Sequence, residues 1–310
     1  MVKDIRIGTR GSTLALVQAN WVAERIRLHN ANVDVEIEII KTSGDKLAAD
    51  SLVSAGGKGL FVKEIETALL ESKVDIAVHS MKDLPMEIPE GLCMAAIPER
   101  AEQRDALVTP YLGLAELPGA ATVGSGSPRR RAQLKRARPD LRLVDIRGNV
   151  DTRLKKLDWG EYDAVVLACA GLERLGLGAR IRQKLPFDIC LPAVGQGALA
   201  IEARCDDKPT LAALKPLDDP AASVSVRAER ALLSALGGGC LAPIGAVAVI
   251  EEGKLRLIAM VADADGGRIV RRQGEGSPDK PEKLGEAVAA ALLDAGAREI
   301  LQDMRPISVP

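Results

Sequence analysis

Arginine is concentrated in one part of the chain. Residues 129–184 contain 15 basic and 7 acidic residues, a net charge of +8, whereas the rest of the chain carries −9 and the whole 310-residue chain −1. Most of these positive charges are arginines, whose planar guanidinium pairs bidentately with carboxylate or phosphate groups. We therefore expect this segment to bind anions locally, although ordinary solvated helix surface could account for about half of its charges.

Several of these arginines follow a predicted strand and open a predicted helix. Ser127 could cap a helix whose first position is Pro128, and Arg129 and Arg130 follow directly. The N-terminus of a helix adds backbone N–H donors that favour anions. Segment 147–153 repeats this arrangement with an arginine at each end, and solubility alone explains neither segment well.

Two further segments place polar side chains after an apolar strand. Lys82 and Asp83 come directly after the predicted strand 75–79, at a strand end of the kind that lines ligand crevices in α/β proteins. Arg10 and Ser12 lie in a glycine turn that follows the first strand. Spacing alone favours the plainer alternatives, a surface ion pair and an ordinary strand-to-helix turn.

Cys240 is the one cysteine whose setting suggests reactivity. It follows three glycines that end an amphipathic helix, and Pro243 comes soon after it. Most free cysteines are inert core residues, but a glycine-rich loop gives this one mobility and access. Its thiolate would be a good nucleophile toward carbon.

Several kinds of site are excluded by what the chain lacks. Two histidines and five widely spaced cysteines give no pattern for a metal centre or a disulfide framework. The glycine segment around Lys58 lacks the spacing and the Ser/Thr of a phosphate-binding P-loop, which leaves a flexible, lysine-bearing loop. Gly195 begins a G-x-G-x-x-A match, but Pro192 interrupts the run before it, so dinucleotide binding is disfavoured.

The composition also bears on partners and location. Balanced charge and only 2% aromatic residues argue against nucleic-acid binding, which would need a basic surface or stacking platforms. No apolar run approaches the ~18 residues that cross a bilayer, and the N-terminus has no apolar leader segment. We expect no membrane partner and a cytoplasmic protein.

The predicted elements indicate an α/β fold followed by a smaller α+β domain. Short apolar strands alternate with amphipathic helices along the first two thirds of the chain, and a long helix, three strands and a last helix follow. Proline-rich and charged stretches near residues 98–119 and 215–220 mark the candidate borders. The strands are predicted at 5–8, 35–40, 75–79, 121–124, 141–145, 164–168, 245–250, 254–261 and 268–273, and the helices at 13–28, 61–71, 221–236 and 283–295.

Taken together, seven segments in order resemble the porphobilinogen deaminase family, also called hydroxymethylbilane synthases, over nearly the whole chain. They are 7–12 (IGTRGS), 56–63 (GGKGLFVK), 79–85 (HSMKDLP), 127–130 (SPRR), 147–154 (RGNVDTRL), 191–198 (LPAVGQGA) and 237–244 (GGGCLAPI).

The resemblance implies two α/β domains like those of periplasmic binding proteins, flanking an active-site cleft, plus a small C-terminal α+β domain. We assign residues 1–98 with 198–216 to the first domain, 103–191 to the second and 220–310 to the third. The return of the chain to the first domain follows from the resemblance alone.

The resemblance also implies a transferase that joins four porphobilinogen molecules head to tail, with loss of ammonia, and releases hydroxymethylbilane for heme biosynthesis. The chain would grow on a dipyrromethane cofactor bound through a thioether to Cys240. Asp83 matches the family's catalytic aspartate, which assists proton transfer and stabilises the cationic azafulvene-type intermediate. The resemblance places Lys82 beside Asp83 among the catalytic residues, and it implies that both also bind the cofactor. The other matched positions bind carboxylates: Ser127, Arg129 and Arg130 those of the cofactor, and Arg10, Ser12, Gln18, Lys58, Arg147, Arg153 and Arg174 those of the substrate.

Two departures from the family pattern and two alternatives remain. Pro128 replaces the usual leucine, and the three glycines before Cys240 are more than usual.

A non-enzymatic two-lobed module that binds carboxylates would explain the arginines but would not need Cys240. Nucleic-acid binding through residues 129–142 would predict steep salt dependence. We expect a monomer, on the resemblance alone.

Overall fold

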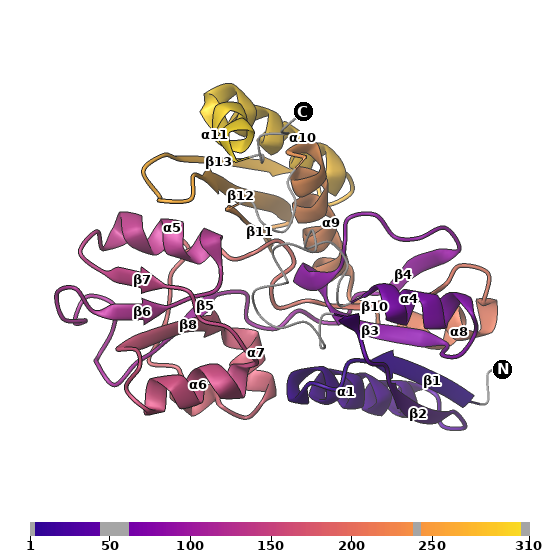
Figure 1. Ribbon diagram of the computed structural model, residues 1–310. Coiled ribbons are helices and arrows are strands. Elements are labelled where there is room, and N and C mark those ends of the chain that lie inside the picture. The colour runs from indigo at the N-terminus through magenta and orange to yellow at the C-terminus, as the bar shows by residue number, and fades with distance from the viewer. Residues whose placement is uncertain (1–3, 44–61, 238–242, 305–310) are drawn as a thin grey trace, which may run out of the picture. The chain divides into compact units, whose positions relative to one another are not determined.

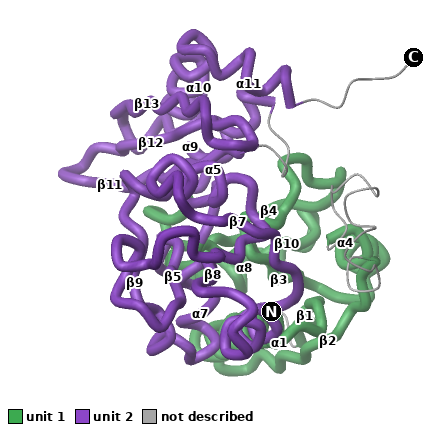
Figure 2. The backbone as a smooth tube through the Cα atoms, turned by 60° about the vertical axis from the view of Figure 1, so that its left-hand side comes forward, with its two compact units in different colours: residues 1–101, 197–223 green, residues 102–196, 224–310 purple. Residues whose placement is uncertain are grey.

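The computed structural model describes residues 4–43, 62–237 and 243–304 (Figure 1). The chain forms two compact units (Figure 2). Unit 1 contains residues 1–101 and 197–223, and unit 2 contains residues 102–196 and 224–310. The chain therefore leaves unit 1, builds the first part of unit 2, and returns to unit 1 before its C-terminal third.

Unit 1 is a five-stranded sheet with helices on both faces. The strand order is β2-β1-β3-β10-β4; β1 is parallel to β2 and β3, and β10 is antiparallel to β3 and β4. Its elements are β1 (Asp4–Thr9), α1 (Thr13–His29), β2 (Asp34–Ile39), α4 (Lys63–Leu70), β3 (Ile76–Ser80), a 3-10 turn (Met81–Asp83), β4 (Leu92–Ala96), β10 (Leu199–Arg204), α8 (Lys208–Leu214) and a second 3-10 turn (Lys215–Leu217).

The central strands β3 and β10 are buried on both faces, whereas the edge strand β2 alternates apolar and charged residues and is mostly exposed. One face packs against α1, where Val22 and Ile26 contact a core that includes Ile7. The other face packs against α4 through Ile65 and Leu69. Alternate residues of β3 consequently point toward different helices.

Unit 2 begins with a sheet of the same topology. The strand order is β7-β6-β8-β5-β9, in which β6 is parallel to β7 and β8, and β5 is antiparallel to β8 and β9. Helices α5 and α6 lie on opposite sides of this sheet (Figure 1). The elements are β5 (Asp105–Val108), β6 (Thr122–Gly124), α5 (Pro128–Ala137), β7 (Arg142–Val144), α6 (Val150–Asp158), β8 (Ala164–Ala168), α7 (Cys169–Arg174), a 3-10 turn (Gly178–Arg180) and β9 (Gln183–Lys184).

The rest of unit 2 is a three-stranded antiparallel sheet, β11-β12-β13, with α9 and α10 packed in its core. The opposite face of this sheet meets α5 through Ala132, Val247 and Met260. Its elements are α9 (Pro220–Ala235), which starts in unit 1, β11 (Ile244–Glu251), β12 (Lys254–Ala262), β13 (Ile269–Gly276), α10 (Pro281–Leu292), a π-helical turn (Leu293–Ala297) and α11 (Arg298–Asp303).

The predicted fold class, α/β with a C-terminal α+β part, is confirmed by these strand orders. Every predicted strand corresponds to an observed one within a few residues. The expected helix 61–71 is shorter, Lys63–Leu70, with residue 61 outside the described residues. Among the described residues, the sequence analysis did not predict the strands β4, β5, β9 and β10.

A substitution at Gly285 tests the close packing of α10 on α9. A Cβ at this position would lie 2.4 Å from the carbonyl oxygen of Ala228 and 2.8 Å from Cβ of Ala231. We expect Gly285→Ala to lower the free energy of unfolding by about 1–3 kcal/mol, because the helices must separate. Gly119, around which nothing lies within 4 Å, is the control: Gly119→Ala should stay within about 0.5 kcal/mol of the parent in urea denaturation.

Candidate functional site

The turn that carries Lys82 and Asp83 is held by its buried flanks. The N–H of Met81 donates to the carbonyl of Ala198 at 3.0 Å, and the N–H of Leu84 donates to the carbonyl of Met81 at 3.2 Å. Met81 and Leu84 are 1% and 4% exposed, whereas Asp83 is exposed and Lys82 partly so. The turn thus presents its two charged side chains from a fixed backbone.

Three more of the predicted residues gather at the same edge of the unit 1 sheet. Since β1 and β3 are parallel neighbours, their carboxyl ends meet at one edge, so Arg10 and Ser12, which follow β1, lie at the edge where Lys82 follows β3. Ser12 caps α1 by accepting the N–H of Ala15 at 3.3 Å. Gln18, which is buried, donates through Nε2 to Oγ of Ser80 at 3.0 Å and so links α1 to the end of β3.

In unit 2, the N-terminus of α5 follows β6 as the sequence predicted. Ser127 is the N-cap and accepts the N–H of Arg130 at 3.5 Å, and Pro128 occupies the first turn. The unusual proline is therefore compatible with this helix start. Arg129 and Arg130 are buried, 4% and 6% exposed, and so do not belong to a solvated helix face.

Asp105, at the start of β5, binds both of these arginines. Its Oδ2 lies 2.7 Å from Nη1 of Arg129, and its Oδ1 lies 2.9 Å from Nε and 2.7 Å from Nη2 of Arg130. Gln196 donates to Oδ1 at 2.9 Å, and the thiol of Cys190 lies 3.3 Å from Oδ2. Asp105 itself is fully buried.

Electrostatics keep this carboxyl group ionised. Burial raises the pKa of Asp105, but the two guanidinium groups outweigh it and hold that pKa well below its usual range. Burial lowers the pKa of Arg129 and the Asp105 carboxylate raises it, with a net rise. Two cations and one anion leave the three side chains with a net charge of +1, which favours an additional anion nearby.

The other predicted site arginines of unit 2 differ from one another in their surroundings. Arg147 follows β7 and donates through Nε to Oδ2 of Asp145 at 2.7 Å, with its side chain 44% exposed. Arg153, in α6, donates through Nε to the carbonyl of Gly148 at 2.7 Å. Arg174 ends α7, and burial lowers its pKa to about 10 despite the opposing effect of Glu173.

Parallel pairing brings part of this set to one edge. Strands β7, β6 and β8 are mutually parallel, so Arg147 after β7 and Ser127 after β6 lie at the same edge of the sheet. The structure thus gives one group of predicted residues in each unit. Cys240 and Lys58 lie outside the described residues.

Asp105 and Gln196 are the site residues that sequence reasoning missed. Asp105 is 24 and 25 positions from its arginines, and Gln196 is 91 positions from Asp105, so spacing gave no indication of these pairs. The signal that could have been used is a carboxylate that opens a four-residue apolar strand, because a charge there must find a partner.

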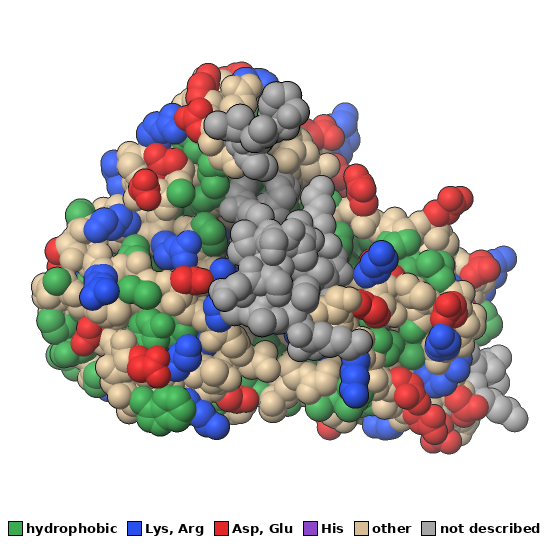
Figure 3. Space-filling view, in the orientation of Figure 1, with side chains coloured by type: hydrophobic (Ala, Val, Ile, Leu, Met, Phe, Trp, Pro, Cys, Tyr) green, Lys and Arg blue, Asp and Glu red, His purple; other side chains and the backbone are tan. Residues whose placement is uncertain are grey.

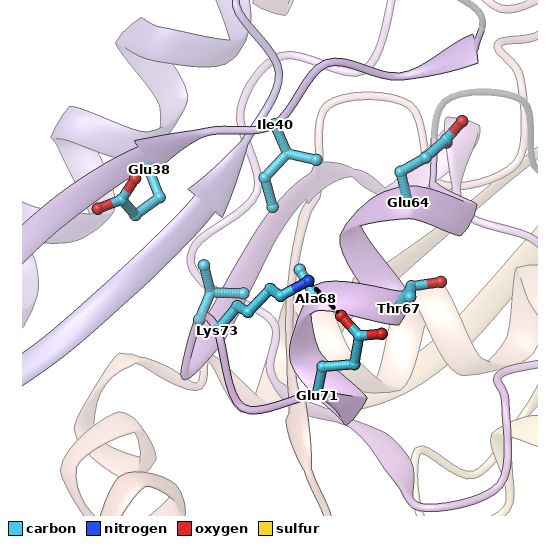
Figure 4. Close-up of a pocket in the computed structure, with 8 residues that line it drawn as sticks. Glu38, Ile40, Glu64, Thr67, Ala68, Glu71 and Lys73 are labelled. Carbon is cyan, nitrogen blue, oxygen red and sulfur yellow. Dashed lines mark ion pairs between the residues drawn. The ribbon is translucent and has the colours of Figure 1, made fainter.

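Charged side chains of both signs are mixed on the visible surface, and a pocket in unit 1 is formed by other residues than the predicted site residues. On the visible face in Figure 3, Lys and Arg side chains are interspersed with Asp and Glu rather than gathered in one patch. A pocket in unit 1 lies between β2 and α4, lined by Glu38, Ile40, Glu64 and Glu71 among others, with Glu71 paired to Lys73 (Figure 4). None of the predicted site residues lines it.

Within the described ranges, no three His, Cys, Asp or Glu side chains are grouped so as to hold a metal ion. Among the same residues, no helix is long and apolar enough to cross a membrane.

Two family models match the chain. Residues 5–212 match "Porphobilinogen deaminase, dipyromethane cofactor binding domain", and residues 223–294 match "Porphobilinogen deaminase, C-terminal domain". The chain belongs to the porphobilinogen deaminase family. This confirms the resemblance inferred from the seven segments.

Curated relatives match this chain over nearly its full length. The porphobilinogen deaminase of Desulforudis audaxviator is 48% identical over 98% of this chain and 99% of its own length. Those of Pelobacter propionicus and Roseiflexus castenholzii are each 49% identical over 97% of this chain, and over 97% and 99% of their own lengths.

Solved structures with a similar fold include periplasmic binding proteins. A TRAP periplasmic solute binding protein from Desulfovibrio salexigens is 12% identical with a TM-score of 0.42, covering 70% of this chain and 73% of that one. A probable amino-acid ABC transporter extracellular-binding protein from Bacillus subtilis is 10% identical with a TM-score of 0.39, covering 70% and 91%. The fold class rests on the strand orders.

Asp105→Asn tests the buried ion pairs of this porphobilinogen deaminase family member. The amide cannot balance two buried guanidinium groups, so we expect the free energy of unfolding to fall by about 3–5 kcal/mol. Asp158, whose carboxylate lies 2.5 Å from Arg180 with its side chain 51% exposed, is the matched control. Asp158→Asn should cost less than about 1 kcal/mol, and equal losses in the two variants would contradict the assignment.

Proposed function

We propose that this chain condenses four porphobilinogen molecules with one water to give hydroxymethylbilane and four ammonia molecules, in tetrapyrrole (heme) biosynthesis. The observation that carries the proposal is the match of both parts of the chain to the porphobilinogen deaminase models, at 48–49% identity to curated members over nearly the full length. The charged groups at the sheet edges of the two units supply the functional groups that this reaction needs.

The dipyrromethane cofactor fits the side chains present. Pyrroles that carry acetate and propionate groups need cationic partners, and the Asp105–Arg129–Arg130 cluster retains a net positive charge next to the N-terminus of α5. We propose that Cys240 holds the cofactor covalently, with Ser127, Arg129, Arg130, Lys82 and Asp83 binding it. When bound, the cofactor supplies the pyrrole end to which the first substrate is joined.

Asp83 is proposed as the catalytic residue, together with Lys82. Its carboxylate is exposed on a turn whose neighbours Met81 and Leu84 are fixed in the core, so it can contact a substrate without reorganising the backbone. It would transfer a proton as ammonia leaves and stabilise, through the pyrrole N–H groups, the cation that remains. Lys82, beside it, would balance substrate carboxylates.

The other charged positions are proposed to bind the growing product. Each added ring brings two carboxylates, and burying them without partners would be costly, so a set of arginines is required. We assign this role to Arg10, Arg147, Arg153 and Arg174, with Ser12, Gln18 and Lys58 assisting. Gln18 would act through Ser80, to which it is hydrogen-bonded, rather than through its own exposed surface.

We also propose three domains, residues 1–98 with 198–216, 103–191 and 220–310, in a cytoplasmic monomer that binds neither nucleic acid nor membranes. The balanced total charge supports the last two statements.

Cys240→Ser tests the cofactor assignment and separates the enzyme from a non-enzymatic carboxylate-binding module. The purified wild-type protein should show an intact mass above that of the chain by two linked pyrroles, and the variant should show the mass of the chain alone and no turnover. Cys205→Ser, at an exposed cysteine, is the control and should keep the added mass. An active wild-type protein of unmodified mass would exclude Cys240 as the attachment point.

Asp83→Asn tests the proposed catalytic residue. Because the Asp83 side chain is exposed and the turn is held by backbone hydrogen bonds of Met81 and Leu84, we expect normal circular dichroism and an unchanged midpoint of thermal unfolding. The kcat for porphobilinogen consumption should fall by about 10²–10⁴-fold, since proton transfer is lost. Glu87→Gln, at an exposed carboxylate four residues later, should retain kcat. Comparable rates in wild type and Asp83→Asn would assign proton transfer to another group.

A further inference from the structure

A buried pair of ionisable side chains lies directly before the turn that carries Asp83. Nε2 of His79, on β3, is 3.0 Å from Oε2 of Glu202, on β10, and the two side chains are only 5% and 0% exposed. A carboxylate can only accept a hydrogen bond, so an ionised Glu202 requires the proton on Nε2 of His79. None of the residues assigned above to cofactor or substrate belongs to this pair.

The strand register explains how the two side chains meet. His79 is opposite Ala200, and Glu202 is opposite Ala77, so His79 and Glu202 are diagonal neighbours on one face of the sheet. This is the face that packs on α4, because Ala77 belongs to the core formed with Ile65 and Leu69. The pair therefore joins β3 to β10 beneath α4.

Glu66 and Cys93 are the other titratable groups that influence the pair. Burial, followed by the negative charge of Glu202, raises the pKa of Glu66, on α4, and His79 opposes that rise. The charge of Glu202 also contributes, after burial and Cys205, to raising the pKa of Cys93 on β4 to about 11. Both neighbours are thus biased toward their neutral forms, and His79 is the side chain that contacts Glu202.

Glu202 depends on His79 for its pairing. Its second oxygen, Oε1, is buried without a hydrogen-bond partner among the described residues. Removing the imidazole would leave a fully buried carboxylate with neither oxygen bound, which is strongly unfavourable. A pair this costly to disrupt keeps the end of β3 in one position.

The end of β3 is fixed on both faces. Successive strand residues point to opposite faces, so Ser80, hydrogen-bonded to Gln18 of α1, fixes the face opposite to that of His79. One residue later, the N–H of Met81 donates to Ala198, just before β10 begins. Three consecutive residues thus anchor the backbone immediately before Lys82 and Asp83.

We propose that His79 and Glu202 form a positioning pair for the reaction, which fixes the turn so that the Asp83 carboxylate meets its substrate in one orientation. The inference rests on the proposed role of Asp83. A buried pair of ionisable side chains is seldom the most stable way to fill a core, and apolar residues of similar volume often stabilise a protein more. The pair lies directly before this turn, and a role in positioning Asp83 explains a buried polar pair at this place, which core packing alone does not explain.

The test separates positioning from stability with a double variant. His79→Leu/Glu202→Leu replaces the buried pair by apolar side chains, so the unfolding midpoint should equal or exceed that of wild type. If the pair positions Asp83, kcat should nevertheless fall by about tenfold or more, with KM for porphobilinogen within about twofold, because small displacements of a catalytic group are costly. Intact mass confirms that each variant carries the same covalent group as wild type.

Single variants and controls complete the design. His79→Gln, whose amide can still donate to Glu202, should recover at least about a third of the wild-type kcat, whereas His79→Leu should not. Glu71→Gln, at an exposed carboxylate that follows α4, should match wild type in both kcat and midpoint. Asp83→Asn is measured in parallel.

The outcomes are distinguishable. A double variant with wild-type kcat beside an inactive Asp83→Asn would overturn the positioning pair and leave the proposed function intact. An active Asp83→Asn would overturn the proposed role of Asp83, whatever the pair does. A loss of kcat that only follows a loss of folded protein, or His79→Gln no better than a folded His79→Leu, would also refute positioning.

Discussion

The arrangement of charge in the interior is the constraint on which the rest of this structure depends. Asp105 is fully buried against two guanidinium groups, and Glu202 is fully buried against one imidazole. Either carboxylate without its partner would be strongly unfavourable, because an unpaired buried charge costs several kcal/mol of a net stability of only about 5–15 kcal/mol. Each therefore dictates which strands and helices must lie next to it.

The two units meet this constraint in related ways. Both sheets have the same strand order and both place an antiparallel strand beside the central parallel one, β10 in unit 1 and β5 in unit 2. In each case that antiparallel strand carries the buried carboxylate, Glu202 or Asp105. The partner in each case lies next to residues that are predicted to be functional, His79 before the Asp83 turn and Arg129 at the start of α5. The same strand arrangement thus places a buried carboxylate beside the predicted site residues of each unit.

Much of this could be predicted from the sequence, and the failures have a common physical cause. Strands such as β3 and β8 are continuous apolar runs, and Ser127-Pro128 is a local helix start, so each could be recognised from neighbouring residues. The partners of Asp105 and Glu202 are 24 to 123 positions away, and nothing in local spacing connects them. The arginines were expected to bind ligand carboxylates, and no local signal indicated that Arg129 and Arg130 already share one carboxylate of the protein.

The late position of β10 in the sequence has a consequence for synthesis of the chain. During translation, β3 emerges with only β1 as a neighbour, and its other edge stays open until residues 199–204 follow more than a hundred positions later. By then the first sheet of unit 2 is already complete. Vectorial folding at the ribosome therefore finishes the middle of the chain before its beginning, and until β10 arrives the nascent protein exposes a strand edge that chaperones can shield from aggregation.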